Sequence, residues 1–243
     1  MQVRPTTVKP RIYTKTTAGS ALVRVGNTQV AGSVTWQIGQ GTAGDVVVQI
    51  ESVTSTSYNQ EPALTIWQSR IQRLLLDTLD WTSLTFQPGW AWRACVGLAI
   101  LQDDGSVTDA LLTAAVAALS TATLPTDLKL QPNGQWAIPS ATATTKASKP
   151  TRPFADAHLP LSLTLGLWYH NDNKPQWMVD PTAAEEAALV DGLLQLIVLE
   201  GTLWSVEFTG EFDALAAHLP LLETLAVERA KEVQDILSAL GDD

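Results

Sequence analysis

The segment from Trp92 to Pro125 constrains the fold most, because it joins three elements without a break. Its first part, A-C-V-G-L-A-I-L, is a short apolar run typical of a buried strand. The acidic turn D-D-G-S-V-T-D follows, and the run 109–119 then favours a helix capped by Thr108 or Asp109. Because this run is rich in alanine, the helix can pack closely on a sheet. The segment therefore predicts a strand, a tight turn and a close-packed helix in direct succession.

The other patterns predict antiparallel strands and two more helices. Short apolar or alternating runs bounded by turn residues indicate the strands, and apolar residues at helical spacing indicate the helices. The first half has strands at 22–25, 28–34, 46–53, 81–86 and 90–101 and a helix at 63–78. The second half has strands at 159–168, 177–179, 193–199 and 202–208 and a closing helix at 219–240.

This order of elements is an α+β pattern in which helices cover antiparallel or mixed sheets. For 243 residues we expect one domain built from two similar halves, residues 1–125 and 154–243. The stretch 131–153 between them contains the run S-A-T-A-T-T-K-A-S-K-P-T, which is poor in large apolar side chains. Such a composition predicts a mobile insertion.

Charge and composition narrow the classes of function. The net charge of −10 argues against a broad, non-specific grip on nucleic acid, because that grip needs many Lys and Arg side chains. Only 16% of the residues are charged, while the chain has nine tryptophans. These tryptophans either form the core or bury the surface against partner proteins, and the sequence leaves both interpretations open.

The single cysteine and the N-terminal residues carry further expectations. Cys95 is the only cysteine, so no disulfide forms within the chain, and its apolar surroundings predict a core thiol. The first residues, M-Q-V-R-P-T-T-V-K-P-R, contain no apolar stretch, and no run of about 18 apolar residues occurs. We therefore expect neither a signal peptide nor a membrane partner.

Four segments resemble the RNase PH family in the same order along the chain. They are G-S-A-L-V-R-V-G-N-T-Q-V at 19–30, D-D-G-S-V-T-D-A with its helix at 103–119, V-D-P-T-A-A-E-E at 179–186, and V-D-G-L-L-Q-L-I-V at 190–198. The last two segments are similar to ring subunits of the eukaryotic RNA exosome. The resemblance covers residues 4–238 and implies the RNase PH-like fold, of the ribosomal protein S5 domain 2-like type.

The resemblance also implies a reaction, phosphorolysis, for which the phosphate site of this chain is degenerate. In active members a D-G-G-T-R turn at a helix start binds inorganic phosphate through backbone N–H groups, a Thr hydroxyl and an Arg. This chain has Ser106, Val107 and Thr108 at the last three positions, so both the Thr and the Arg are replaced. Asp103, Asp104 and Asp109 surround the turn, which contains no positively charged residue. A phosphate dianion is then disfavoured by several kcal/mol.

The acidic motif of the family, D-x-D-Y-x-E-D, is degenerate as well. Asp180 keeps its first acidic position and Thr182 replaces the second, and a lone Asp before Pro is more typical of a turn than of an acid catalyst. The segment 55–62, at the family's Arg-bearing loop, has no basic residue. Glu185 and Glu186 could hold a metal with Asp180, although a solvated helix start explains them more simply. We predict no catalytic residue, cofactor or metal site.

The resemblance implies a non-catalytic structural subunit of the exosome core. That core is a hetero-hexameric ring of RNase PH-like chains around a pore that threads RNA for 3′-to-5′ processing and degradation. The implied partners are other ring subunits, joined through sheet edges, and a cap subunit with S1 domains. The implied localisation is the nucleus and nucleolus, and also the cytoplasm.

Two basic clusters are RNA-contact candidates at a pore mouth, with ordinary solubilising charge as the alternative. The first comprises Arg4, Lys9, Arg11, Lys15 and Arg24, and the second comprises Lys146, Lys149 and Arg152. Two other functions stay open at this point. One is an active phosphate-dependent exoribonuclease that uses Asp180, and the other is an unrelated small-molecule enzyme or binding protein with a deep polar pocket.

Overall fold

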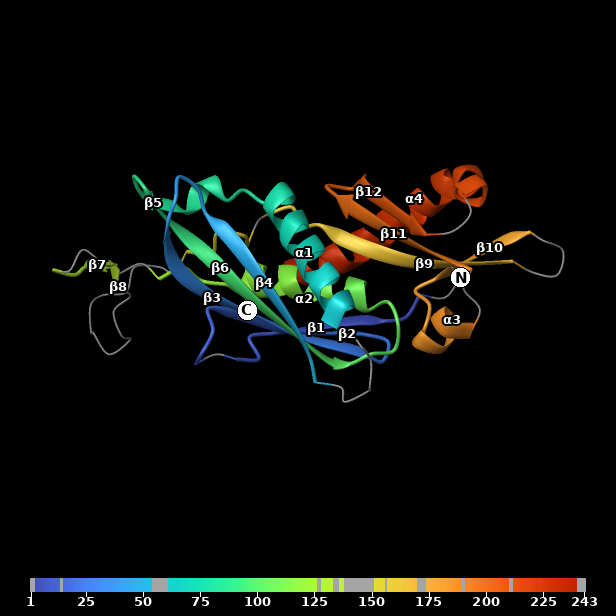
Figure 1. The fold of residues 1–243 in the computed structure, drawn as a ribbon, viewed down its shortest axis with the longest axis horizontal. Coiled ribbons are helices and arrows are strands. Elements are labelled where there is room, and N and C mark those ends of the chain that lie inside the picture. Colours follow the sequence, from blue (N-terminus) through green and yellow to red (C-terminus); the bar gives the residue numbers. More distant parts are fainter. Residues whose placement is uncertain are drawn as a thin grey trace.

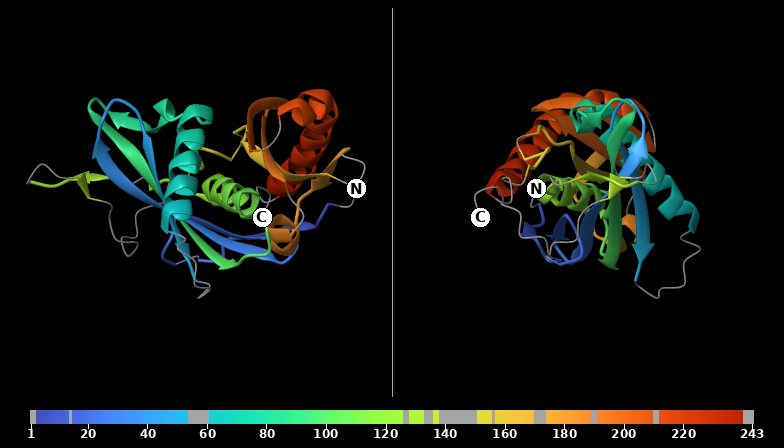
Figure 2. Two further views of the ribbon diagram at one scale, coloured as in Figure 1. Left: turned by 45° about the vertical axis from the view of Figure 1, so that its right-hand side comes forward. Right: turned by 90° about the vertical axis from the view of Figure 1, so that its left-hand side faces the viewer.

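Two sheets with a helix between them form the frame of the molecule (Figure 1, Figure 2). The computed structural model describes residues 3–13, 15–53, 61–125, 128–132, 136–137, 151–155, 157–169, 174–188, 191–209 and 212–239. The central helix is α2 (Val107–Thr121), which contacts β2, β3 and β6 of the first sheet and β9 of the second. The predicted α+β pattern is confirmed.

The first sheet has the order β1–β2–β3–β6–β4, with a short β5 beside β6. Its strands are β1 (Thr6–Pro10), β2 (Gly19–Val25), β3 (Thr28–Gln40), β4 (Asp45–Ser52), β5 (Thr85–Gln87) and β6 (Trp90–Gln102). Paired neighbours are antiparallel, except that β4 runs parallel to β6. The predicted turn between β2 and β3 forms at Gly26, whose φ is +58°.

The strand predicted at 81–86 is wrong in its first part, where Thr82–Leu84 form a 3-10 turn. Asp80 Oδ1 accepts hydrogen bonds from Thr82 N (2.9 Å) and Thr82 Oγ1 (2.5 Å). Such a local side-chain bond offers the backbone an alternative to strand pairing. The pattern of apolar residues alone does not reveal it.

The second sheet has the antiparallel order β10–β9–β11–β12. Its strands are β9 (Leu161–Tyr169), β10 (Pro175–Val179), β11 (Gly192–Leu199) and β12 (Thr202–Thr209). Helix α4 (Phe212–Ser238) packs on β9, β11 and β12, and α1 (Glu61–Thr78) packs on β4. One continuous hydrophobic cluster joins both sheets and their helices.

Glycines let α2 approach the first sheet closely, as the alanine-rich sequence predicts. A Cβ atom on Gly19 would lie 2.3 Å from Ala118 O, and one on Gly32 would lie 2.5 Å from Ala114 O. The predicted cap at Thr108 or Asp109 is wrong, because the helix begins at Val107 and Ser106 stands at the N-cap. All residues of α2 except Thr108 are buried.

Other element boundaries also differ from the prediction. Helix α4 begins at Phe212 rather than at 219 and continues through Pro220, and Leu215 and Leu222, on either side of this proline, are both buried. Strand β1 and the short helix α3 (Ala183–Ala188) were not predicted. The pairing of β7 (Lys129–Leu130) with β8 (Trp136–Ala137) touches the expected insertion, which otherwise lies largely outside the described residues.

At least four of the nine tryptophans belong to the core, and the burial of exposed tryptophan against partner proteins stays a prediction. Trp36, Trp81, Trp92 and Trp177 are buried in the core, whereas Trp204 is 53% exposed. Cys95, expected in the core, is only half-buried, and its partial burial raises the pKa of the thiol. Among the described residues, no helix is long and apolar enough to cross a membrane.

Candidate functional site

Two turns from different halves of the chain meet at one place, which we call the junction. It consists of residues 103–106, before α2, and residues 180–182, before α3. A Cβ atom on Gly105 would lie 2.4 Å from Pro181 O, so the two backbones are in direct contact. Gly105, Ser106 and Asp180 all have positive φ, at +83°, +49° and +55°. The junction is therefore a close backbone crossing that only glycine allows at position 105.

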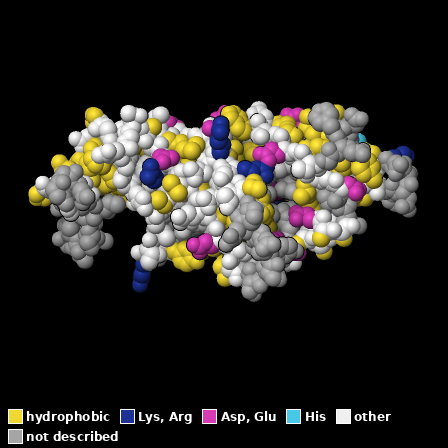
Figure 3. Space-filling model, viewed as in Figure 1, with side chains coloured by type: hydrophobic (Ala, Val, Ile, Leu, Met, Phe, Trp, Pro, Cys, Tyr) yellow, Lys and Arg dark blue, Asp and Glu magenta, His cyan; other side chains and the backbone are white. Residues whose placement is uncertain are grey.

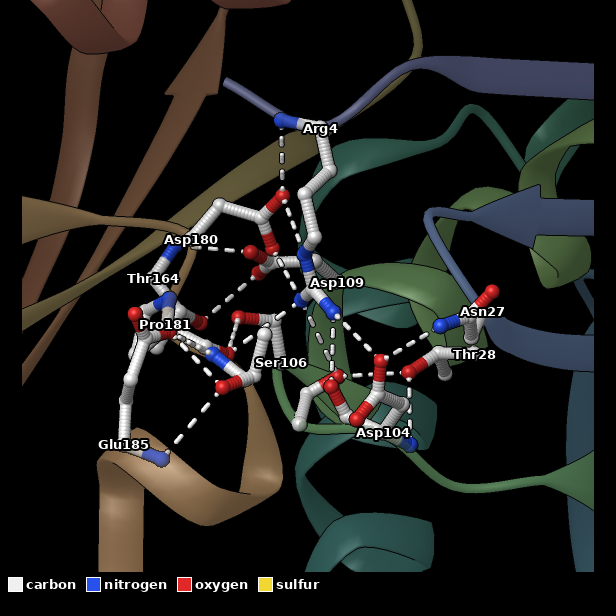
Figure 4. A network of polar contacts seen from close by, with 12 residues as sticks. Arg4, Asn27, Thr28, Asp104, Ser106, Asp109, Thr164, Asp180, Pro181 and Glu185 are labelled. Carbon is white, nitrogen blue, oxygen red and sulfur yellow. Dashed lines mark hydrogen bonds and ion pairs between the residues drawn. The ribbon is translucent and has the colours of Figure 1, made fainter. Parts of the chain in front are cut away.

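Arg4 brings a positive charge into the junction (Figure 4). Its Nε donates to Asp180 Oδ2 at 2.9 Å and its Nη2 to Asp180 Oδ1 at 2.5 Å. Its Nη1 donates to Asp104 O at 2.6 Å and lies 3.6 Å from Asp104 Oδ2. Burial alone would lower the pKa of Arg4, but the hydrogen bonds and charge of Asp180 raise it above its ordinary value. The expectation of a turn without positive charge is therefore wrong.

The start of helix α2 is met by a carboxylate of the same chain. Ser106 N donates to Glu186 Oε1 at 2.9 Å, and the Ser106 hydroxyl donates to Pro181 O at 3.2 Å. Burial raises the pKa of Glu186, although the Ser106 bond acts in the opposite direction. Glu186 was expected to be part of a solvated helix start. It instead supplies an anionic group at the helix N-terminus, where the dipole favours negative charge.

Asp109 lies inside the protein and not on the surface of the turn. Its Oδ1 accepts from Ser162 Oγ (2.7 Å) and Thr164 Oγ1 (3.0 Å), and its Oδ2 accepts from Thr164 N (2.7 Å). Burial raises the pKa of Asp109 to about 6, although these hydrogen bonds act in the opposite direction. Asp109 thus joins α2 to β9, and the expectation that it surrounds the turn together with Asp103 and Asp104 is wrong.

Thr182 caps the short helix α3. Thr182 N and Oγ1 both donate to Glu185 Oε2 at 2.8 Å, and Glu185 N donates to Thr182 Oγ1 at 3.3 Å. This reciprocal pattern is a capping box, T-x-x-E, which could have been read from the sequence. The hydrogen bonds from Thr182 lower the pKa of Glu185. Within the described residues, no group of three or more His, Cys, Asp or Glu is placed to hold a metal ion.

Thr108, at the family's Arg position, borders a groove beside α1. Two adjoining cavities, of about 380 and 340 Å³, both have Thr108 in their lining. The second also contains Ser106, Val107, Thr164 and Glu186. The structure therefore places three of the predicted degenerate positions, Ser106, Val107 and Thr108, beside one open cavity, whereas Asp180 and Thr182 lie on the other turn of the junction.

The other basic candidates differ from Arg4 in being mostly exposed where the structure describes them. Lys9 and Arg24 are exposed on one face of the β1–β2 ladder, where Lys9 is opposite Leu22 and Arg24 is opposite Thr7. Arg11 and Lys15 are exposed nearby in the chain, and Arg152 is half-buried. Lys146 and Lys149 lie outside the described residues. That these residues contact RNA stays a prediction. Arg4 is already paired with Asp180, so an RNA phosphate would have to compete with that carboxylate for it.

The sequence did not reveal the role of Arg4, because its partners are distant in the chain. Asp104 lies 100 positions away and Asp180 lies 176 positions away. Thr28 was missed for the same reason, since its Oγ1 donates to Gly105 O at 2.8 Å and accepts from Asp104 N at 2.9 Å. No local pattern marks either residue.

Comparison with known proteins places these features in a family. Residues 2–125 match the family described as "3′ exoribonuclease family, domain 1". The chain is 26% identical, over 98% of its length and 88% of the relative, to the exosome complex component Rrp42 of Methanopyrus kandleri.

Solved structures share the fold. An archaeal exosome core matches with a TM-score of 0.72 and 21% identity, over 97% of this chain and 87% of that one. Rice (Oryza sativa) Rrp46 matches with a TM-score of 0.67 and 17% identity, over 99% and 96%. The fold is thus RNase PH-like, as the resemblance implied.

Proposed function

The chain belongs to the 3′ exoribonuclease family, and we propose that it serves there as a non-catalytic subunit of an exosome core ring. Membership of the family makes the interpretation as an unrelated small-molecule protein wrong. One observation carries the proposal of a non-catalytic role. Every charge that phosphorolysis would use at the junction is already bound within the chain.

Phosphorolysis needs an anion site, a positive charge and an acidic group near the leaving oxygen. Here the N–H of Ser106 binds Glu186, the guanidinium of Arg4 binds Asp180, and Thr108 stands at the Arg position. Asp180 has a side chain that is only 2% exposed. Incoming phosphate would meet two carboxylates and would have to break an ion pair to gain a cation.

The identity of the ring subunit, its partners and its localisation are proposals as well. The segment T-T-A-G-S-A-L-V-R-V-G-N-T-Q-V at 16–30 resembles the eukaryotic ring subunit called ribosomal RNA-processing protein 43. We propose that the chain pairs with RNase PH-like neighbours in a hetero-hexameric ring and contacts a cap subunit with S1 domains. It would act in the nucleus, nucleolus and cytoplasm, and it would support RNA degradation and rRNA processing through assembly and threading.

Two experiments test the role separately. The purified chain, incubated with 5′-labelled RNA and inorganic phosphate, should produce no nucleoside diphosphate. Phosphate-dependent shortening that Asp180→Ala abolishes would favour the active exoribonuclease instead. The mass of the complex that co-purifies with the tagged chain should correspond to several related subunits, and a stable, monodisperse monomer from the same cells would contradict the ring.

A further inference from the structure

A β-bulge on the edge strand β12 lies at Trp204, which lines a cavity together with residues of α1. In the β11–β12 ladder, Ile197 pairs with Ser205 and Val198 pairs with Leu203, so Trp204 is the extra residue between them. Bulges of this kind re-aim a side chain and recur at functional sites. Trp204 is 53% exposed and lines the cavity of about 380 Å³. A large aromatic side chain is therefore presented to solvent at the rim of a cavity.

This cavity and its neighbour form a continuous groove, which we call the α1–β12 groove. Its floor and walls are mostly apolar and include Trp67, Ile71, Leu74, Leu112, Ile197 and Trp204. The residues that line both cavities, and so lie where the cavities adjoin, are Trp67, Arg70, Thr108, Gln195 and Glu207. On the face in Figure 3, hydrophobic side chains and charged side chains of both signs lie together near the centre, where α1 and β12 approach each other in Figure 1.

The net charge of the groove lining is negative, which disfavours binding of a polyanion. Arg70 forms an ion pair with Glu207 across the groove and donates to Gln195 Oε1 at 3.3 Å, and Arg73 pairs with Asp77 at 3.2 Å. The lining has two guanidinium groups and four carboxylates, a net charge of −2, contributed by Arg70, Arg73, Asp77, Asp103, Glu186 and Glu207. Both guanidinium groups are neutralised by partners. A nucleic-acid backbone needs free positive charge, so the groove disfavours RNA.

We propose that the α1–β12 groove is a docking site for a short segment of another protein, which inserts an apolar side chain beside Trp204 and places a Lys or Arg near Asp103 and Glu186. An exposed Trp next to a pocket has the character of a binding hot spot, where few residues supply most of the affinity. Asp103 and Glu186, at the other end, accept backbone hydrogen bonds from Gly105 and Ser106 but form no ion pair with a groove-lining cation, so they give charge complementarity to a basic side chain. Because the groove includes the edge strand β12 and the degenerate positions Ser106, Val107 and Thr108, the proposal rests on the proposed non-catalytic role.

Defined peptides test the proposal with the full chain. The probe is a fluorescein-labelled peptide with two leucines followed by two lysines, and two matched peptides carry glutamates for the lysines or serines for the leucines. Fluorescence anisotropy should show that the leucine–lysine peptide binds at least about tenfold more tightly than either matched peptide. Equal binding of the three peptides, or no binding by the first, would overturn the proposal.

Variants locate the binding. Trp204→Ala should weaken the leucine–lysine peptide about tenfold or more, whereas Leu221→Ala, at a 60% exposed position on α4, should leave its affinity unchanged. Circular dichroism checks that both variants stay folded, and the peptide comparison on the unaltered chain stands independently of them. Unchanged affinity in a folded Trp204→Ala chain would refute the location. Displacement of the peptide by a single-stranded oligouridylate would show that RNA is the occupant instead.

Discussion

Arg4 and Asp180 stand 176 positions apart and form a two-pronged ion pair, with Nε 2.9 Å from Oδ2 and Nη2 2.5 Å from Oδ1. The backbone oxygen of Arg4 also accepts from Arg229 Nη2 of α4 at 2.9 Å. The N-terminal segment is therefore held between the last helix and the junction. It connects the first sheet, through β1, to a turn that follows a strand of the second sheet.

Removing Arg4 should destabilise the fold strongly. Arg4→Ala leaves the buried carboxylate of Asp180 without its cation, and breaking a buried pair in this way costs about 3–5 kcal/mol. Arg4→Lys should recover only part of the loss, because an ammonium group cannot make the two-pronged contact. Denaturant unfolding measures both free energies. The double variant with Asp180→Asn should lose less than the sum of the single losses, and strict additivity would mean that the two residues do not interact.

Gly105→Ala should be far more damaging than a glycine substitution at an open turn. Gly105 has φ +83° and no space for a Cβ, since Pro181 O would lie 2.4 Å away. Gly89 has a similar φ of +80° but nothing within 4 Å of the added atom. Gly89→Ala therefore measures the backbone strain alone, about 1 kcal/mol. The extra loss in Gly105→Ala reports the contact between the two turns, and equal losses in the unfolding free energy would argue against that contact.

The sequence predicts those parts of the fold that depend on local patterns. The β2–β3 hairpin, β6, β11 and the close-packed α2 follow from apolar spacing, turn residues and small side chains. Strand β1 was missed because its sequence, T-T-V-K-P, has no alternation of apolar and polar residues. In the structure its residues are only half-buried or exposed, so the strand needs no apolar face. Its place at the sheet edge depends on pairing with β2.

The candidate site was predictable in its residue types but not in its charges. The replacements at Val107, Thr108 and Thr182 are visible in the sequence. The contacts that neutralise the junction, from Arg4 to Asp180 and from Ser106 to Glu186, join residues that are 176 and 80 positions apart. Only the folded chain brings them together, so the sequence alone did not show that Arg4 lies beside the acidic turn.

The titration of Asp109 should make stability fall as the pH rises. Its pKa is raised from 3.8 to about 6 in the folded chain, which therefore holds the proton more tightly than the unfolded chain. The stabilisation is fully present below about pH 3.8 and is lost as the pH rises through about 6. By linkage this loss amounts to about 3 kcal/mol.

Asp109→Asn isolates this effect because it removes the titrating group and keeps a side chain that can bond Ser162 and Thr164. Between about pH 4 and pH 7 its unfolding free energy should fall by about 2–3 kcal/mol less than that of the unaltered chain. Asp77→Asn, at an exposed position on α1, is the control and should follow the unaltered chain. Parallel curves for Asp109→Asn and the unaltered chain would contradict the raised pKa.

Substitutions of Glu186 distinguish a structural role of this carboxylate from a catalytic one. Glu186→Ala removes the acceptor of Ser106 N, which should cost about 1–3 kcal/mol in unfolding free energy, whereas Glu186→Gln keeps an acceptor oxygen and should cost less. A structural carboxylate predicts that RNA degradation by the complex that co-purifies with the chain is unchanged in Glu186→Gln. The measurement is the rate of RNA shortening per assembled complex, so that a loss of assembly is not mistaken for a loss of chemistry. A tenfold slower rate in a fully assembled complex would place Glu186 in a reaction and would contradict the non-catalytic role.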